Sequence, residues 1–375
     1  MKKIIYLDNA ATTRVYPAVA EEINKFLSEN YGNPSSIHRL GDGAAEVIKI
    51  AREKIAREIG AKPWEIIFTS GGTEANNLAM NGLTLTNPKK KKIIISSIEH
   101  PSIYELCNFL KNWGYKIVEI PVDKEGIVDL KNLEREIDDE TLLVSVMHVN
   151  NEIGTIQDIK KIGEICRQKK VYFHTDAVQS FSKLKIDVKE MNVDLLSASG
   201  HKIGGPKGIG FLYIREGIKV SPIIIGGGQE RGMRSGTENV PCIVGFAKAL
   251  EQAKKVDKEK IIKLRYQMIF ELEKIGGKIN GSKMNRIYNN VNVSFPGIEG
   301  DSAVIFLSER GIMCSTGSAC KSRNQEKSRV LKAIGLNDKE TSGSLRFTLN
   351  EDISEKDMNY VVSEVDKVVR KLRIN

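Results

Sequence analysis

The segment LLSASGHKIGGPKGIGFLYI, residues 195–214, places a lysine and a histidine between two hydrophobic runs and surrounds them with glycine. The first run ends at Ser199, and Lys202 follows within three residues. Most lysines lie on the surface, where the stem and the charge are both solvated, and that remains the alternative interpretation. A lysine just beyond a strand-like run, among residues with little side-chain bulk, favours a reactive amine.

The chain has 375 residues, of which 41% are hydrophobic, so it can bury roughly 75% of its unfolded surface. This length predicts two domains or one large domain with an appendage. The 57 basic and 48 acidic residues give a formal charge of +9. Basic residues are spread along the chain apart from NPKKKKI, residues 87–93, which we interpret as a solvated loop. We therefore expect no direct nucleic-acid binding, although a basic surface could favour acidic protein partners.

The N-terminal residues MKKIIYLDNAATT contain an apolar run too short for a signal peptide, and no later run reaches membrane-spanning length. We expect a cytoplasmic protein without membrane association. The five cysteines are odd in number and form no C-x-x-C pair, which argues against a disulfide framework and against a zinc site. We expect no bound metal and at least one free thiol.

Hydrophobic periodicity alternates between helix and strand from about residue 17 to residue 257. Apolar residues recur at helical spacing in residues 17–30 and 43–60. Short β-branched runs occupy residues 66–70, 92–97, 115–122, 141–149, 171–177 and 193–199. This alternation is typical of an α/β protein with a mainly parallel sheet covered on both faces.

The composition changes after a charged helical segment, residues 258–275. A β-rich segment, a glycine-punctuated segment and a closing helix at residues 355–372 follow. We interpret this part as a smaller α+β domain with its boundary near residue 258.

In open α/β sheets the ligand site lies beyond the carboxyl ends of the strands. Five successive strand ends carry polar, titratable or glycine residues. They are Gly71-Gly72-Thr73, Glu99-His100, Asn150-Asn151-Glu152, Asp176-Ala177-Val178-Gln179 and Ser199-Gly200-His201-Lys202. We predict that they form one pocket.

Two of these segments indicate an anion and a cation site. Gly72 and Thr73 open a helical stretch after a strand, where free backbone N–H groups and the helix dipole favour an anion. The spacing fits neither a Walker loop nor G-x-G-x-x-G, and a plain tight turn is the alternative. Asp176 follows a buried strand and must find a cationic or donor partner, unless it is only a helix N-cap.

An anion cradle, a buried aspartate and a pocket lysine together fit pyridoxal phosphate. In this interpretation Lys202 forms the Schiff base and Asp176 keeps the pyridine nitrogen protonated. His100 could lie flat on the ring and Gln179 could reach its phenolic oxygen. For His100 the alternative is a helix-capping position before Pro101.

A second reactive centre is GIMCSTGSACKSRNQEKSR, residues 311–329. Cys320 lies among small and cationic residues, a setting that lowers a thiol pKa. Cys107, Cys166 and Cys314 lie beside apolar residues and are expected to be inert core thiols, while the state of Cys242 stays open.

The motifs occur in the order found in cysteine desulfurases of the NifS/IscS type, which the chain resembles over nearly its whole length. They are YLDNAATT, GNPSSIH, FTSGGTEANN, EHPS, MHVNNEIG, HTDAVQS, SGHKIGGPKG, GGGQERGMRSGTENV and STGSACKS. The resemblance implies the aspartate-aminotransferase-like fold (fold type I), with a mainly parallel seven-stranded sheet. Residues 15–257 would form the large domain, and residues 1–14 and 258–375 the small domain carrying the catalytic cysteine loop at about 314–330.

The same resemblance assigns roles to residues of this chain. Lys202 would carry the cofactor, Asp176 would pair with its pyridine nitrogen, Gln179 would bind the ring oxygen, and His100 would stack on the ring as an acid–base group. Cys320 would be the nucleophile. The residues that would hold the phosphate are Gly72, Thr73, Ser199, His201 and, from the other subunit of a homodimer, Thr237. Asn151 and Arg346 would bind the substrate carboxylate, for which a guanidinium fork is well suited.

The activity implied is conversion of L-cysteine to L-alanine, with the sulfur left as a persulfide on Cys320. A sulfur-acceptor protein, such as an iron–sulfur scaffold or a tRNA-thiolation protein, would then receive it. The alternatives are a selenocysteine lyase or another aminotransferase of this fold, or a non-catalytic basic scaffold for tRNA or iron–sulfur partners. The chain departs from the long-loop group at Lys321 and in the segment Gln325-Glu326-Lys327-Ser328, where that group usually has Leu-Glu-Pro-Ser, which leaves the acceptor and the loop's stiffness open.

Overall fold

A seven-stranded sheet lies at the centre of the computed structural model, which describes residues 3–317 and 327–374. In spatial order its strands are β2 (Ile66–Thr69), β8 (Gly210–Ile214), β7 (Leu195–Ser199), β6 (Tyr172–Asp176), β5 (Thr141–Ser145), β3 (Lys92–Ser96) and β4 (Lys116–Ile120). Neighbouring strands are parallel, except that β8 runs antiparallel to both of its neighbours. The predicted mainly parallel seven-stranded sheet is confirmed.

Helices cover both faces of this sheet, which explains why its strands are continuous hydrophobic runs. One face packs against α1 (Pro17–Ser28), α2 (Arg39–Glu58), α5 (Leu130–Glu136), α6 (Ile159–Gln168) and α7 (Val240–Ala253). The other packs against α3 (Gly72–Thr86) and α4 (Pro101–Lys111). Alternate residues of a strand serve the two cores: Ile94 faces the first, and Ile93 and Ile95 face the second.

The C-terminal part has a core of its own. Its helices are α8 (Lys258–Lys274), α9 (Gly300–Ser308), α10 (Arg329–Ala333), α11 (Asp338–Ser342) and α12 (Glu355–Ile374). Its strands are β9 (Lys278–Ile279), β10 (Asn290–Ser294) and β12 (Ser344–Thr348), which form an antiparallel sheet in the order β12-β10-β9, and β11 (Ile312–Met313). Short 3-10 helices are η1 (Pro63–Glu65), η2 (Gly200–Lys202) and η3 (Glu230–Gly232).

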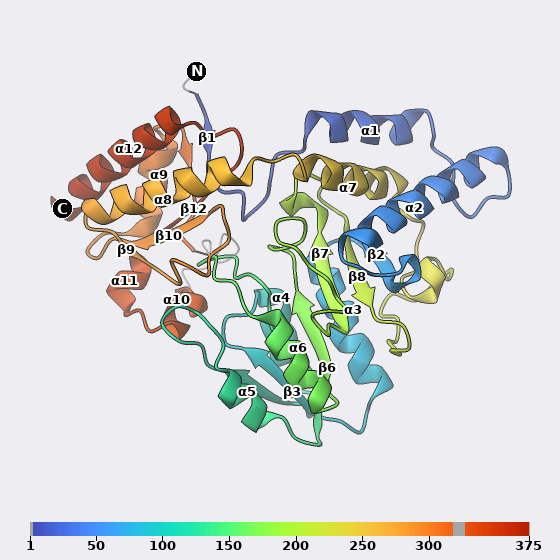
Figure 1. The fold of residues 1–375 in the computed structure, drawn as a ribbon. Helices are drawn as coiled ribbons and strands as arrows, with labels where there is room; N and C mark the ends of the chain where they lie inside the picture. Colours follow the sequence, from blue (N-terminus) through green and yellow to red (C-terminus); the bar gives the residue numbers. More distant parts are fainter. Residues whose placement is uncertain (1–2, 318–326, 375) are drawn as a thin grey trace.

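The N-terminal residues pack into this second core. Strand β1 (Ile5–Tyr6) pairs in parallel with β11, and Ile5 and Leu7 are buried among residues of α8, β10 and α12. Figure 1 shows β1 beside the C-terminal elements, while α1 lies with α2 and α7 on the other side of the molecule. On these cores we propose the division into residues 15–257 and residues 1–14 with 258–375.

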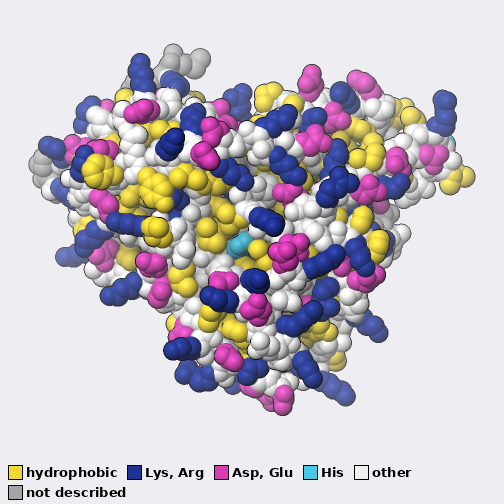
Figure 2. Space-filling model, viewed as in Figure 1, with side chains coloured by type: hydrophobic (Ala, Val, Ile, Leu, Met, Phe, Trp, Pro, Cys, Tyr) yellow, Lys and Arg dark blue, Asp and Glu magenta, His cyan; other side chains and the backbone are white. Residues whose placement is uncertain are grey.

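The surface carries both signs of charge. Figure 2 shows Lys and Arg side chains spread over one face and interspersed with Asp and Glu. None of the helices within the described ranges combines the length and the apolar character needed to cross a membrane.

The loop that precedes α7 is fixed by a buried ion pair. Glu230 and Arg231 both adopt left-handed backbone conformations, with φ of 46° and 56°, which side chains other than glycine adopt rarely. Both carboxylate oxygens of Glu230 accept from the Arg52 guanidinium, at 2.7 and 2.8 Å, and one also accepts from the Phe68 N–H at 2.8 Å. The Arg52 guanidinium also lies 4.7 Å from the centre of the Phe68 ring. These contacts fix the loop on which Thr237 lies.

We predict that Arg52→Met lowers the free energy of unfolding by about 3 kcal/mol, because Glu230 would then be buried without a counter-charge. Thermal unfolding of the purified protein measures this change. Lys49→Met is the matched control, since Lys49 lies on the same helix but its pair with Glu46 is solvent-exposed, and its effect should stay under about 0.5 kcal/mol. Equal effects of the two substitutions would contradict the role given to Arg52.

Candidate active site

A cavity of about 290 Å³ lies at the carboxyl ends of the parallel strands. It is lined by ten of the residues that the sequence singled out, together with residues of the N-terminal segment. The ten are Gly72, Thr73, His100, Asn151, Asp176, Gln179, Ser199, His201, Lys202 and Arg346. The five predicted strand ends, the N-terminal segment and β12 therefore meet at one site.

Not every polar residue at these strand ends faces the cavity. Glu99 is buried behind it, where it accepts from the Ser96 hydroxyl at 2.5 Å and from the Met147 N–H at 2.8 Å, and burial raises its pKa to about 8. Asn150 stabilises the loop in which it lies, because its side-chain oxygen accepts from the N–H groups of Glu152 and Ile153. These residues support the site without lining it.

One end of the cavity is suited to an anion. Gly72 begins helix α3, and a Cβ at this position would lie 2.6 Å from a methyl group of Val178, so glycine keeps the helix N-terminus open. Thr73 lies beside it, and Ser199 and His201 reach the same cavity from the end of β7. Burial, together with the nearby charges of Lys202, Lys207 and Lys183, lowers the pKa of His201 to about 4. His201 is therefore a neutral hydrogen-bonding group near neutral pH.

Asp176 is a buried carboxylate with two protein donors. It is 3% exposed and accepts from the Val178 N–H at 2.9 Å and from the Asn76 side-chain nitrogen at 2.8 Å. A carboxylate offers about four lone-pair sites, so capacity remains for a cationic N–H in the cavity. Residues 178–183 form turns, so Asp176 does not cap an α-helix.

Lys202 is in the cavity rather than on an ordinary solvated surface. Its Nζ donates to the backbone carbonyls of Ala10 and Ala11, at 2.6 and 2.8 Å. The Gln179 side-chain nitrogen also donates to the Ala10 carbonyl, at 2.9 Å. The N-terminal segment thus orients both the amine and the amide.

His100 both caps a helix and faces the cavity, so the two interpretations of this residue are compatible. It is the N-cap of α4, and its Nδ1 accepts from the Ser102 N–H at 3.1 Å. Burial lowers the pKa of its imidazole, an effect that nearby Asp176 opposes and nearby Lys202 reinforces.

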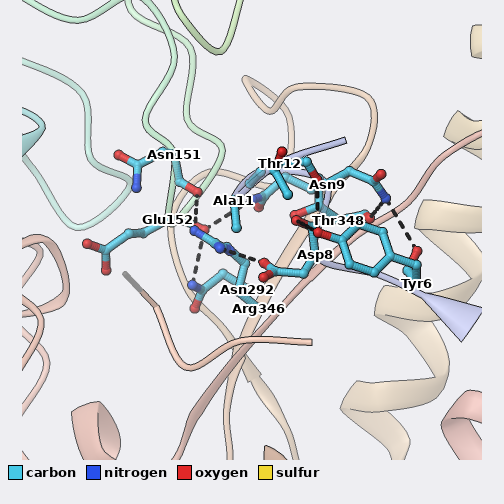
Figure 3. A network of polar contacts seen from close by, with 12 residues as sticks. Tyr6, Asp8, Asn9, Ala11, Thr12, Asn151, Glu152, Asn292, Arg346 and Thr348 are labelled. Atoms are coloured by element: carbon cyan, nitrogen blue, oxygen red, sulfur yellow. Dashed lines mark hydrogen bonds and ion pairs between the residues drawn. The ribbon is translucent and has the colours of Figure 1, made fainter. Parts of the chain in front are cut away.

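Arg346, from β12, also lines the cavity, and Figure 3 shows its polar contacts. It is 1% exposed, and its guanidinium donates to the Asp8 carboxylate at 2.7 Å and to the Asn151 carbonyl at 3.0 Å. Its Nε is buried without a hydrogen-bond partner among the described residues. The guanidinium is therefore oriented by protein groups while donor capacity is left for an anion.

Sequence reasoning missed the residues that orient the predicted ones. Asp8 holds Arg346, Asn76 holds Asp176, and Ser102 contacts His100. Asp8 and Asn76 do fall inside quoted motifs, YLDNAATT and FTSGGTEANN, but nothing in their immediate neighbours indicates those partners.

Two further site residues were predicted from the sequence, Thr237 and Cys320. Thr237 is exposed on the loop between η3 and α7. Cys320, with Lys321, Gln325 and Glu326, lies outside the described residues. Within the described ranges, no group of three or more His, Cys, Asp or Glu side chains is placed to hold a metal ion.

Known proteins are similar to this chain over its full length. Residues 5–361 match the family Aminotransferase class-V. "Cysteine desulfurase IscS" of Dictyoglomus turgidum is 47% identical, covering 100% of this chain and 96% of its own. A solved structure titled "NIFS-LIKE PROTEIN" has a TM-score of 0.93 at 38% identity and covers 99% of this chain and 100% of its own. Another, titled "SspA in complex with cysteine", has a TM-score of 0.85 at 39% identity and covers 94% and 99%.

The chain therefore belongs to the class-V aminotransferase family. Within that family its likeness is to the cysteine desulfurases of the NifS/IscS type, and the resemblance noted from the motifs is confirmed. Enzymes of this family use pyridoxal 5'-phosphate. The cavity fits this cofactor, since it combines an open helix N-terminus for a phosphate, a buried carboxylate for a ring N–H and an amine for a carbonyl carbon.

The cysteines among the described residues are unsuited to reaction as thiolates. Cys107, Cys166 and Cys314 are buried, as predicted, and Cys242 is partly buried. Burial raises the pKa of all four thiols, to about 12 for Cys107 and Cys314.

We predict that brief treatment of the native protein with iodoacetamide near neutral pH leaves Cys107, Cys166 and Cys314 unmodified, because they are buried and protonated. Peptide mass spectrometry measures the modification at each site. The same treatment in denaturant should modify all five cysteines, which controls for detection. Native-state modification of any of these three at the rate of the unfolded chain would contradict their assignment as core thiols.

Proposed function

We propose that the protein is a pyridoxal-phosphate-dependent cysteine desulfurase. It takes up L-cysteine, releases L-alanine and retains the sulfur as a persulfide on Cys320. The observation that carries the proposal is that the Asp176 carboxylate and the Lys202 amine share one cavity with an anion-binding helix N-terminus and the Arg346 guanidinium. The similarity to named cysteine desulfurases supports the choice of substrate.

The residues that line the cavity would each hold one part of the cofactor. Gly72, Thr73, Ser199 and His201 would bind the phosphate, Gln179 would donate to the ring oxygen, and His100 would contact the ring. Asp176 would accept the ring N–H and keep the nitrogen protonated. When bound, the cofactor supplies an electron sink for the carbanion that forms at the substrate's Cα.

Lys202 is the base of the reaction. Its amine would hold the cofactor in the absence of substrate and, with substrate bound, would be free to remove the Cα proton. The Ala10 and Ala11 carbonyls, which the amine contacts in the structure, are available to hold it once it is released.

Arg346 and Asn151 bind the substrate carboxylate and orient its sulfur toward the thiolate of Cys320. Thiolate attack forms the S–S bond as the C–S bond of the substrate breaks. The electron pair of that bond stays with the substrate carbon, which takes up a proton and leaves as alanine. The sum is cysteine plus enzyme thiol giving alanine plus enzyme persulfide, so no external oxidant is required.

We propose that the enzyme is a cytoplasmic homodimer in which Thr237 of the partner subunit completes the phosphate site. The exposure of Thr237 on an anchored loop supports this arrangement. The persulfide would be passed to an acceptor protein of iron–sulfur cluster assembly or of tRNA thiolation.

We predict that Cys320→Ala keeps the visible absorbance of the bound cofactor but forms alanine at least roughly a hundredfold more slowly, because no thiolate is present to attack the substrate sulfur. Alanine release and mass spectrometry of the persulfide are the measurements, and Cys242→Ala is the matched control with unchanged activity. Lys202→Ala should lose the visible band. Full turnover by the Cys320 variant would remove that thiol from the mechanism, and a colourless wild-type protein would favour a non-catalytic scaffold.

We predict that Arg346→Lys raises the KM for cysteine by roughly tenfold or more while the visible spectrum of the cofactor is retained, because a single ammonium cannot serve Asp8, Asn151 and a carboxylate with fork geometry. Steady-state kinetics measures KM and kcat separately. Arg310→Lys, in an ion pair with Glu364 in the C-terminal core, is the control. An unchanged KM in the Arg346 variant would exclude this residue from carboxylate binding.

A further inference from the structure

Two groups of Ser102 contact one ring nitrogen of His100, Nδ1. Its Nδ1 lies 3.1 Å from the Ser102 backbone nitrogen and 2.8 Å from the Ser102 Oγ. A backbone N–H can only donate, so Nδ1 must accept and carries no proton. The Ser102 hydroxyl must then donate to Nδ1 as well.

A chain of hydrogen bonds fixes the direction of that hydroxyl. The Asn76 side-chain nitrogen donates to the Ser102 Oγ and to an Asp176 oxygen, both at 2.8 Å. The carboxylate only accepts, so the Asn76 amide must turn its nitrogen toward it, and a flipped amide would set two oxygens against each other. The Ser102 Oγ accepts from Asn76 and, because the Ser102 N–H makes Nδ1 an acceptor, directs its own hydrogen to Nδ1. Asn76 therefore donates both to Asp176 and to Ser102, and Ser102 donates to His100.

The other ring nitrogen, Nε2, makes no such contact. Nε2 of His100 has no hydrogen-bond partner among the described residues, and the ring lines the cavity. With Nδ1 unprotonated, a neutral ring carries its proton on Nε2. The charged groups that face the ring are Asp176 and Lys202, and burial together with Lys202 lowers the imidazole pKa.

We propose that Ser102 and Asn76 are positioning residues that hold His100 as the neutral Nε2–H tautomer, so that His100 serves the reaction as a hydrogen-bond donor. This inference rests on the proposed desulfurase function and refines the acid–base role that the family resemblance implies for this residue.

Proton transfer by this imidazole is unfavourable in both directions. Loss of the Nε2 proton from a neutral ring would leave an imidazolate anion. Gain of a second proton would place an N–H on Nδ1 and break the hydrogen bond that Nδ1 accepts from the Ser102 N–H. The proton at the substrate's Cα is therefore moved by Lys202, while His100 donates a hydrogen bond and keeps its proton.

Nuclear magnetic resonance of the holoenzyme with nitrogen-15-labelled histidine tests the tautomer directly, because the ring nitrogen shifts separate Nδ1–H, Nε2–H and imidazolium forms. We expect His100, assigned from its absence in a His100→Asn variant, to be neutral Nε2–H around neutral pH. An Nδ1–H or imidazolium signal for His100 in the wild type would overturn the proposal.

Variants at Ser102 test the positioning role. Ser102→Ala removes the hydroxyl donor, and Ser102→Pro removes the N–H donor as well at a first-turn helix position where proline is tolerated. We expect the Nδ1–H or imidazolium signal of His100 to increase from the wild type to Ser102→Ala and again to Ser102→Pro. Ser97→Ala is the matched control, since its hydroxyl is three residues away and buried without a partner among the described residues, and the His100 signal should not move. An unchanged signal in both Ser102 variants would contradict the assignment.

Two amide replacements separate donation from acid–base chemistry. Glutamine places an N–H near the position of Nε2 and asparagine near that of Nδ1, and neither transfers protons. We expect the turnover of His100→Gln to be roughly tenfold or more higher than that of His100→Asn. Equal loss in both variants would contradict donation by Nε2. Desulfuration and persulfide formation by the wild type, measured in the same series, show separately whether the proposed function itself holds.

Discussion

A carboxylate almost completely withdrawn from water, Asp176, is the constraint on which the site depends. A buried charge is costly unless donors surround it, and Asp176 is 3% exposed at the end of a central strand. Two protein donors, the Val178 N–H and the Asn76 amide, stabilise it. A cationic ring nitrogen of the cofactor would complete the arrangement, so the cost of burying the Asp176 carboxylate favours binding of the cofactor.

The N-terminal segment connects the cavity that contains Asp176 to the core of the C-terminal part. Ile5 and Leu7 are buried with the C-terminal elements, and Asp8 pairs with Arg346. The next residues turn back to the large sheet, where the Ala10 and Ala11 carbonyls accept from Lys202. The Thr13 hydroxyl continues this contact by donating to the backbone carbonyl of His201. A segment of about ten residues thus sets the distance between the guanidinium that would bind a substrate carboxylate and the amine that would act on its Cα.

The fold and most of the cavity could be predicted from sequence because their signals are local. Each strand is a short apolar run, and each strand end carries its own polar residues, so Asp176, His100 and Lys202 could be placed at one edge of the sheet. The orienting residues could not be predicted in this way. Asn76 lies 100 positions from Asp176, and Asp8 lies 338 positions from Arg346, so no neighbouring residue indicates the pairing.

Other features depend on geometry that a sequence pattern does not express. The left-handed backbone at Glu230 and Arg231 is formed by residues that rarely adopt it, and contacts of both side chains hold it, Glu230 with Arg52 and Arg231 with the carbonyls of Trp64 and Ile66. The direction of the hydrogen bonds from Asp176 through Asn76 and Ser102 to His100 likewise requires distances. The role of Cys320 and the domain boundaries stay predictions.

The account is tested most directly by hydrogen exchange at the Cα of cysteine in heavy water, catalysed by the Cys320→Ala variant, which cannot take up sulfur. If Asp176 and Lys202 act on one bound cofactor, cysteine recovered from this reaction will carry deuterium at Cα. Adding Asp176→Ala to the same variant will then slow the exchange by roughly a hundredfold or more, because the ring loses its electron sink. Exchange that proceeds equally well without the carboxylate would contradict the central claim.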